Sequence, residues 1–196
     1  MPKMTANNLM TLESYNKLRP QIRESVMAHK KNRKVPLGEN VTLIFEDEMT
    51  MRYQVQEMLR AEKIFDEAGI QDEIATYNPL IPDGNNWKAT LMIEYPDPTE
   101  RAARLAKLIG VEDKVWVKVA GFNAVYAIAD EDLERATAIK TSSVHFLRFE
   151  LAPAMIKRLQ QGAELSMGVD HPAYRAKLAP VDEAIRASLL RDLTVG

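Results

Sequence analysis

The stretch from Leu37 to Phe65 constrains the fold more than any other part of the chain. Residues 41–46 alternate between two faces, which is the pattern of a strand with one buried side. An acidic turn at residues 46–48 follows, and residues 49–68 then place apolar side chains at the three- and four-residue spacing of a helix. Gly69 is well placed to end that helix. This stretch predicts a strand that turns directly into one long helix, with the remaining chain packed against both.

Further strands are predicted from the same alternation. Residues 87–95 and 142–151 alternate as strands. The second is the longest and carries apolar residues on both faces, so it is expected in the sheet interior. Residues 114–119 and 124–129 form a predicted hairpin across a short turn. Residues 163–169 are a last predicted strand.

Helices are predicted between these strands, and proline and glycine mark their ends. Arg19-Pro20 is expected to divide the N-terminal region into two helices, and residues 1–10 are expected to form a loose arm. Because the hairpin and the short links favour antiparallel pairing, we expect one α+β domain over residues 1–196, with a mainly antiparallel sheet of about five to six strands packed with helices. Other helices are expected from about residue 98 to 109 and over residues 131–138, 153–162 and 180–193.

The composition bounds the kind of protein. With 196 residues, 46% of them hydrophobic and 28% charged, the chain can build a full core and is not disordered throughout. The formal net charge of −2 does not favour binding to nucleic acid. The chain has no cysteine, which excludes disulfides, thiolate zinc sites, cysteine nucleophiles and cysteine-bound iron–sulphur clusters within it.

No apolar run approaches the roughly 20 residues that a membrane span needs. The N-terminus also has no apolar core of signal-peptide length. We therefore expect a cytoplasmic protein that does not bind membranes, and the oligomeric state stays open.

The sequence contains none of the common catalytic, flavin or nucleotide-binding motifs, so no cofactor of these kinds is expected and the question of an enzyme stays open. Three histidines far apart in the sequence predict no tightly bound zinc, iron or copper. A carboxylate-rich site that uses His145 or His171 is compatible with the composition. A carboxylate site for magnesium or manganese is not excluded either, because those ions need only oxygen ligands. His145 lies in an apolar alternation and is more simply interpreted as a core histidine. His171 lies in a loop before a proline and is either a ligand or a loop anchor.

Charged side chains recur on the strand faces opposite the most apolar residues. Arg148 and Glu150, for example, lie about 7 Å apart on one predicted strand face. Such a face is either solvated or the wall of a groove that binds a polar ligand. For a groove, the candidate ligand-binding residues are Glu57, Arg60, Glu94, Lys118, Arg148, Glu150 and His171.

Two charged segments flank the strand at residues 41–46. The run from His29 to Lys34 is basic, and the turn at residues 46–48 is acidic. A basic run at the end of a helix commonly complements the helix dipole, but both segments also suit an encounter with a charged partner. The candidate partner-contact residues are Lys30, Lys31, Arg33, Glu46 and Glu48.

The chain resembles a bacterial family of unknown function, DUF3501, in five blocks that occur in order: LGENVTLIFED, YQVQEMLRAEKI, YNPLIPDGNNWKATLMIEYPD, VHFLRFEL and VDHPAYR. The resemblance spans about Leu12 to Tyr174 and carries no catalytic residue over to this chain. Members tend to be encoded beside rubrerythrin-like proteins and iron–sulphur oxidoreductases. The resemblance therefore implies an accessory or binding role beside such a redox partner.

The alternative function is that of an enzyme or a small-ligand binder that uses a charged groove on the sheet face. A deep pocket that holds Glu57, Glu94, Arg148 and Glu150 would favour this alternative. A shallow charged face together with an exposed apolar patch would favour the accessory role.

Overall fold

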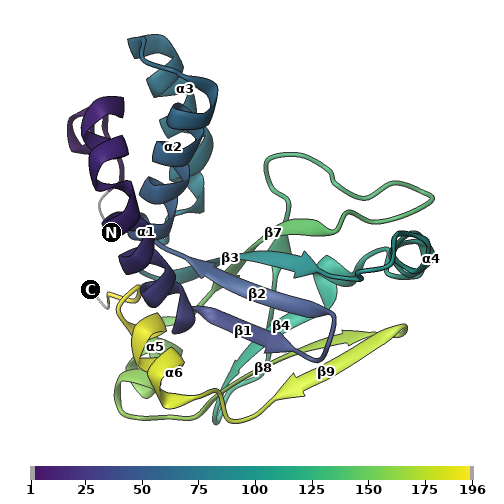
Figure 1. Ribbon diagram of the computed structural model, residues 1–196. Helices are drawn as coiled ribbons and strands as arrows, with labels where there is room; N and C mark the ends of the chain where they lie inside the picture. Colours follow the sequence, from purple (N-terminus) through teal and green to yellow (C-terminus); the bar gives the residue numbers. More distant parts are fainter. Residues whose placement is uncertain (1–2, 195–196) are drawn as a thin grey trace.

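The computed structural model describes residues 3–194 and arranges their strands in two antiparallel sheets (Figure 1). The α+β class and the antiparallel pairing are as predicted, but the strands divide between two sheets. The first sheet has the order β1 (Lys34–Leu37), β2 (Val41–Glu46), β3 (Asn86–Ile93), β7 (Val144–Glu150) and β6 (Ile128–Ala129). The second has the order β5 (Val125–Tyr126), β4 (Val115–Val119), β8 (Leu165–His171) and β9 (Tyr174–Leu178).

The main hydrophobic core is shared by the two sheets. On β3, Trp87 and Leu91 are buried in it, as the alternation predicted, and β4 and β8 contribute Val117 and Met167. β7 pairs with β3 on one side and with β6 on the other, so the strand predicted over residues 142–151 lies inside its sheet.

Three helices stand beside the first sheet and enclose a smaller core of their own. They are α1 (Leu12–Lys31), α2 (Glu48–Glu62) and α3 (Glu67–Tyr77), purple and blue in Figure 1, and their core includes Met51 and Val55. The helices α4 (Pro98–Lys107), α5 (Pro153–Gln160) and α6 (Glu183–Leu190) contribute to the main core instead. Short 3₁₀ turns are η1 (Ala6–Asn8), η2 (Asn78–Leu80) and η3 (Val111–Lys114). Among residues 3–194, no helix is both long enough and apolar enough to cross a membrane.

The first correction concerns the N-terminal helix. α1 continues through Pro20 and is not divided there. A proline inside a helix removes one backbone hydrogen bond, and this cost is offset because Tyr15 and Val26 on either side of it are both buried. Residues 3–10 are not a loose arm either: Met4 is 2% exposed, and its backbone N–H donates to the Asn78 side chain at 2.8 Å. Residues 1 and 2 lie outside the described part of the chain.

The helix predicted over residues 49–68 is two helices. Lys63 adopts a left-handed φ of 55° and ends α2, and Asp66 then caps α3 by accepting a hydrogen bond from the Gly69 N–H at 2.8 Å. Gly69 therefore lies inside a helix. Phe65, which the single helix would have buried, is 81% exposed.

Residues 131–138 are not helical. Asp130 does not cap a helix there, because its carboxylate turns toward β7 instead. One oxygen is 2.5 Å from His145 Nδ1, and the other accepts a hydrogen bond from the Phe146 N–H at 2.9 Å.

Candidate functional site

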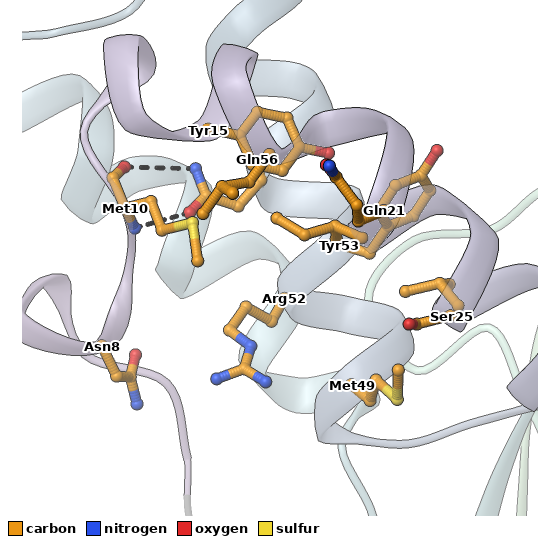
Figure 2. Close-up of a pocket in the computed structure, with 12 residues that line it drawn as sticks. Asn8, Met10, Tyr15, Gln21, Ser25, Met49, Arg52, Tyr53 and Gln56 are labelled. Carbon is orange, nitrogen blue, oxygen red and sulfur yellow. Dashed lines mark hydrogen bonds between the residues drawn. The ribbon is translucent and has the colours of Figure 1, made fainter.

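An apolar groove of about 390 Å³ runs between α1 and α2 (Figure 2). Leu18 and Met10, which line it, are 46% and 42% exposed. Single exposed apolar residues are ordinary, but a concave surface that gathers several of them is typical of a binding site. The other large apolar side chains of the lining are Tyr15, Ile22, Val26, Met49 and Tyr53.

The groove follows from the sequence of α1. Tyr15, Leu18, Ile22 and Val26 recur at the spacing of one helix face. Tyr15 and Val26 are buried, whereas Leu18 is exposed and Ile22 is only half-buried. Pro20 lies in this middle turn and cannot donate the backbone hydrogen bond of a regular helix. The apolar face of α1 is therefore covered at its two ends and open at its centre.

Polar groups border the groove on the α2 side. The Gln56 side chain accepts a hydrogen bond from the Met10 N–H at 2.6 Å and donates one to the Met10 carbonyl at 3.3 Å, as Figure 2 shows. These bonds fix the segment before α1 against α2. Arg52 Nε lies 3.5 Å from the Glu48 carboxylate and places one partly exposed cation at the edge of the groove.

An ion cluster next to Tyr15 joins the two helices. Glu57 on α2 accepts hydrogen bonds from the Tyr15 hydroxyl at 2.7 Å and from Arg19 at 2.7 and 2.9 Å, and Arg60 lies 3.6 Å away. The Arg19 hydrogen bonds, with help from Tyr15, lower the pKa of Glu57 to about 2. Burial, together with the Glu57 carboxylate, raises the pKa of Tyr15. Of these two ligand candidates, Glu57 thus holds α1 against α2, and Arg60 pairs with Glu57 within α2.

The Glu57→Gln variant is expected to be less stable than wild type at neutral pH, by about 1 kcal/mol for a partly exposed, charge-assisted cluster. The folded-state pKa of about 2 lies below the ordinary value of 4.5, so ionised Glu57 stabilises the fold above pH 4.5 and loses this effect as the pH falls toward 2. The stability gap between the two proteins should therefore shrink over that range. Urea unfolding of both proteins measures it, and a gap that does not change with pH would contradict the assignment.

Arg148 and Glu150 lie together on the face of the first sheet that is turned away from the main core, and they bind each other. Arg148 also donates to Glu131 at 2.7 and 2.8 Å, and the Asn86 side chain donates to Glu150 at 3.0 Å. The hydrogen bonds to Glu131, followed by those to Glu150, raise the pKa of Arg148. These groups therefore satisfy one another on a half-buried surface.

The remaining ligand candidates lie elsewhere. Glu94 is exposed just beyond β3, and Lys118 is exposed on the outer face of the second sheet. His171 is buried and anchors the β8–β9 turn, because Nδ1 accepts the Ala173 N–H at 3.1 Å and Nε2 lies 3.0 Å from the Ile109 carbonyl. In the described part of the chain, no contact joins Glu57 or Glu94 to the Arg148–Glu150 pair. The deep charged pocket is not assembled by these contacts.

Arg33, a partner-contact candidate, is buried and makes its contacts within the fold. It is 1% exposed, and its guanidinium donates to the Phe45 carbonyl at 2.8 Å and to the Glu46 carbonyl at 3.1 Å. It also binds the Asp192 carboxylate, which is 1% exposed, and lies 3.4 Å from Asp47.

Glu46 is likewise buried. Its carboxylate accepts hydrogen bonds from the hydroxyl groups of Thr50 at 2.5 Å and Thr90 at 2.8 Å, so it ties β2 to α2 and β3. Of the other partner-contact candidates, Lys31 is exposed, and Lys30 and Glu48 are half-buried.

The sequence does contain a pattern that indicates the groove, but the helix break predicted at Pro20 obscured it. A helix divided at Pro20 assigns Leu18 and Ile22 to different elements, so their common face disappears. Once α1 is continuous, the same residues form one stripe at three- and four-residue spacing.

Comparison with known proteins agrees with the resemblance in sequence. A family model described as "Protein of unknown function (DUF3501)" matches residues 3–193. A crystal structure of a novel protein of unknown function from Burkholderia pseudomallei K96243 is 55% identical, with a TM-score of 0.93, and the match covers 98% of this chain and 100% of that one. The search of curated proteins gave no match.

Proposed function

Because this chain belongs to the DUF3501 family, whose function is unknown, we propose from its geometry that it is a non-catalytic accessory protein that binds a partner protein through the groove between α1 and α2. The observation that carries the proposal is the concave apolar surface of about 390 Å³ with Leu18 exposed in its lining. The occupant is an apolar segment of an iron–sulphur or rubrerythrin-like redox protein, the class of partner that the family resemblance implies.

Several of the charged candidate residues support this proposal, because they are paired or buried within the chain. Arg148 is bound to Glu131 and Glu150, and Arg33 and Glu46 are buried. These three candidate residues therefore offer little charge to a partner, whereas Lys31 stays exposed. An apolar contact depends less on ionic strength than a contact between exposed charges does. We therefore expect the complex to survive moderate salt.

Photo-crosslinking tests the location of the contact. A photoreactive amino acid that replaces Leu18 should crosslink to an iron–sulphur or rubrerythrin-like protein in the cells that naturally produce this chain. The same amino acid in place of Arg175, which is exposed on β9 outside the groove, should not. Equal crosslinking from both positions, or none from Leu18, would overturn the proposal.

A charge placed in the groove tests its chemistry. We expect Leu18→Glu to reduce recovery of the partner at least tenfold, because docking would bury an unpaired carboxylate. Asn16→Glu is the matched control, since Asn16 is exposed on the same helix and does not line the groove. Co-purification of the affinity-tagged proteins at low and at moderate salt measures recovery. Undiminished recovery with a folded Leu18→Glu protein would exclude the groove.

A further inference from the structure

A buried polar cluster lies away from the groove, where η3 and the segment before β7 meet β7. Its members are Glu112, Thr141 and His145, which are 8%, 1% and 0% exposed. Polar groups buried to this extent are expected to have partners of good geometry. The partners that these groups present to one another resemble the ligands of a cation.

Several donor atoms surround His145 Nε2. The Thr141 hydroxyl oxygen is 2.8 Å away, the Ser142 carbonyl oxygen 3.1 Å, and a Glu112 carboxylate oxygen 3.8 Å. The Thr141 and Glu112 oxygens are 3.4 Å apart. Atoms that bind one divalent ion at about 2.1 Å lie roughly 3 to 3.5 Å from their neighbours, so these separations suit a shared ion after only small shifts.

Asp130 completes the arrangement from the other side of the ring. It accepts a hydrogen bond from His145 Nδ1 at 2.5 Å. With the proton on Nδ1, the lone pair of Nε2 is available to coordinate a metal ion. A carboxylate that orients a histidine in this way is the usual outer partner of a metal-bound imidazole. Asp130 has a φ of 49°, a conformation uncommon outside glycine, and the Phe146 N–H holds its second carboxylate oxygen. The backbone thus fixes Asp130 where the histidine needs it.

We propose that this cluster is a site for a divalent manganese ion, with His145 Nε2, a Glu112 carboxylate oxygen, the Thr141 hydroxyl and the Ser142 carbonyl as ligands. Glu112 and Asp130 contribute two negative charges, and Arg135, 3.2 Å from Asp130, offsets at most one of them, since it also binds Asp132 at 2.6 Å. A neutral imidazole therefore leaves a net negative charge in a buried site, which a cation compensates.

The donor set selects the kind of ion. Oxygen ligands suit magnesium, calcium and manganese, whereas an imidazole nitrogen suits first-row transition ions. Manganese(II) accepts both. Because His145 and Thr141 are almost fully buried, the ion would link η3 and the segment before β7 to β7 as a structural element, without access for a substrate.

Metal loading of the refolded chain tests the site. The full chain, free of any histidine tag, is unfolded in denaturant with chelator and refolded with or without manganese chloride. We expect about one equivalent of manganese to remain after gel filtration, together with loss of the free-ion electron paramagnetic resonance signal. Glu112→Gln and Asp130→Asn should weaken binding roughly tenfold to a hundredfold.

The matched control is Glu100→Gln, which removes an exposed carboxylate that pairs with Arg104 at 3.4 Å, and this variant should bind as wild type does. If Glu112→Gln fails to fold, wild type and Thr141→Val provide the comparison. Wild-type protein that retains no manganese, or a Glu112→Gln protein that binds it as tightly as wild type, would overturn the proposal and leave His145 as an ion-paired core histidine.

Discussion

Replacing Arg33 with methionine is expected to destabilise the protein by about 3 to 5 kcal/mol, the usual cost of removing one partner of a buried ion pair. Methionine keeps much of the aliphatic stem but removes every donor. The Phe45 and Glu46 carbonyls then lose their hydrogen bonds from Arg33, and Asp192, at 1% exposure, loses its cation. Denaturant unfolding of the variant and wild type measures the loss.

The pH dependence of this loss identifies its source. Burial raises the pKa of Asp192 to about 6, against the opposing effect of Arg33. A carboxyl whose folded-state pKa exceeds the ordinary 3.8 favours the fold when protonated, and this benefit disappears as the pH rises through 6. Without Arg33, ionised Asp192 becomes more costly, so the deficit of Arg33→Met should be larger above pH 6 than below it.

Lys31→Met is the matched control, because it removes a cation from the exposed part of the same basic run. A surface substitution of this kind usually changes stability by less than about 0.5 kcal/mol. If Arg33→Met were as stable as Lys31→Met, the guanidinium would not be structural, and its role as a partner contact would have to be reconsidered.

The strands with one regularly buried face, such as β3 and β7, were the most predictable part of the fold. On β3, every second residue from Trp87 to Ile93 is buried, and the period of two is visible in the sequence alone. The division into two sheets was not predictable in this way. Whether β4 pairs with β8 or joins β3 depends on long-range packing that local alternation does not encode.

The charged candidates show where sequence patterns stop being informative. Arg33 lies in a basic run, but its partner Asp192 is 159 residues later in the chain. Glu46 lies in an acidic turn, but Thr90 on the neighbouring strand covers it. Whether a run of charged residues is exposed or buried depends on which distant residues pack on it. The same sequence pattern can therefore occur on the surface or in the core.

Replacing Trp87 with alanine is also expected to cost about 3 to 5 kcal/mol, as deletions of a buried aromatic side chain commonly do. Trp87 is 0% exposed, and its ring packs edge to face on the Phe45 ring with the ring centroids 6.0 Å apart. Its Nε1–H donates to the Leu189 carbonyl at 2.9 Å and so attaches α6 to β3. Alanine removes the packing and the hydrogen bond together, and unfolding in denaturant reports their sum.

Trp87→Phe separates the two contributions, since phenylalanine retains an aromatic ring but no donor. It should cost about 1 to 3 kcal/mol, mainly because the buried Leu189 carbonyl is left without that partner. Equal losses in the alanine and phenylalanine variants would mean that the hydrogen bond to α6, and not the ring, accounts for the stability.

Trp87 and Arg33 bind neighbouring residues, Leu189 and Asp192, at the end of α6. Trp87→Phe combined with Arg33→Met should therefore cost less than the sum of the two single losses, because either change alone already releases this segment.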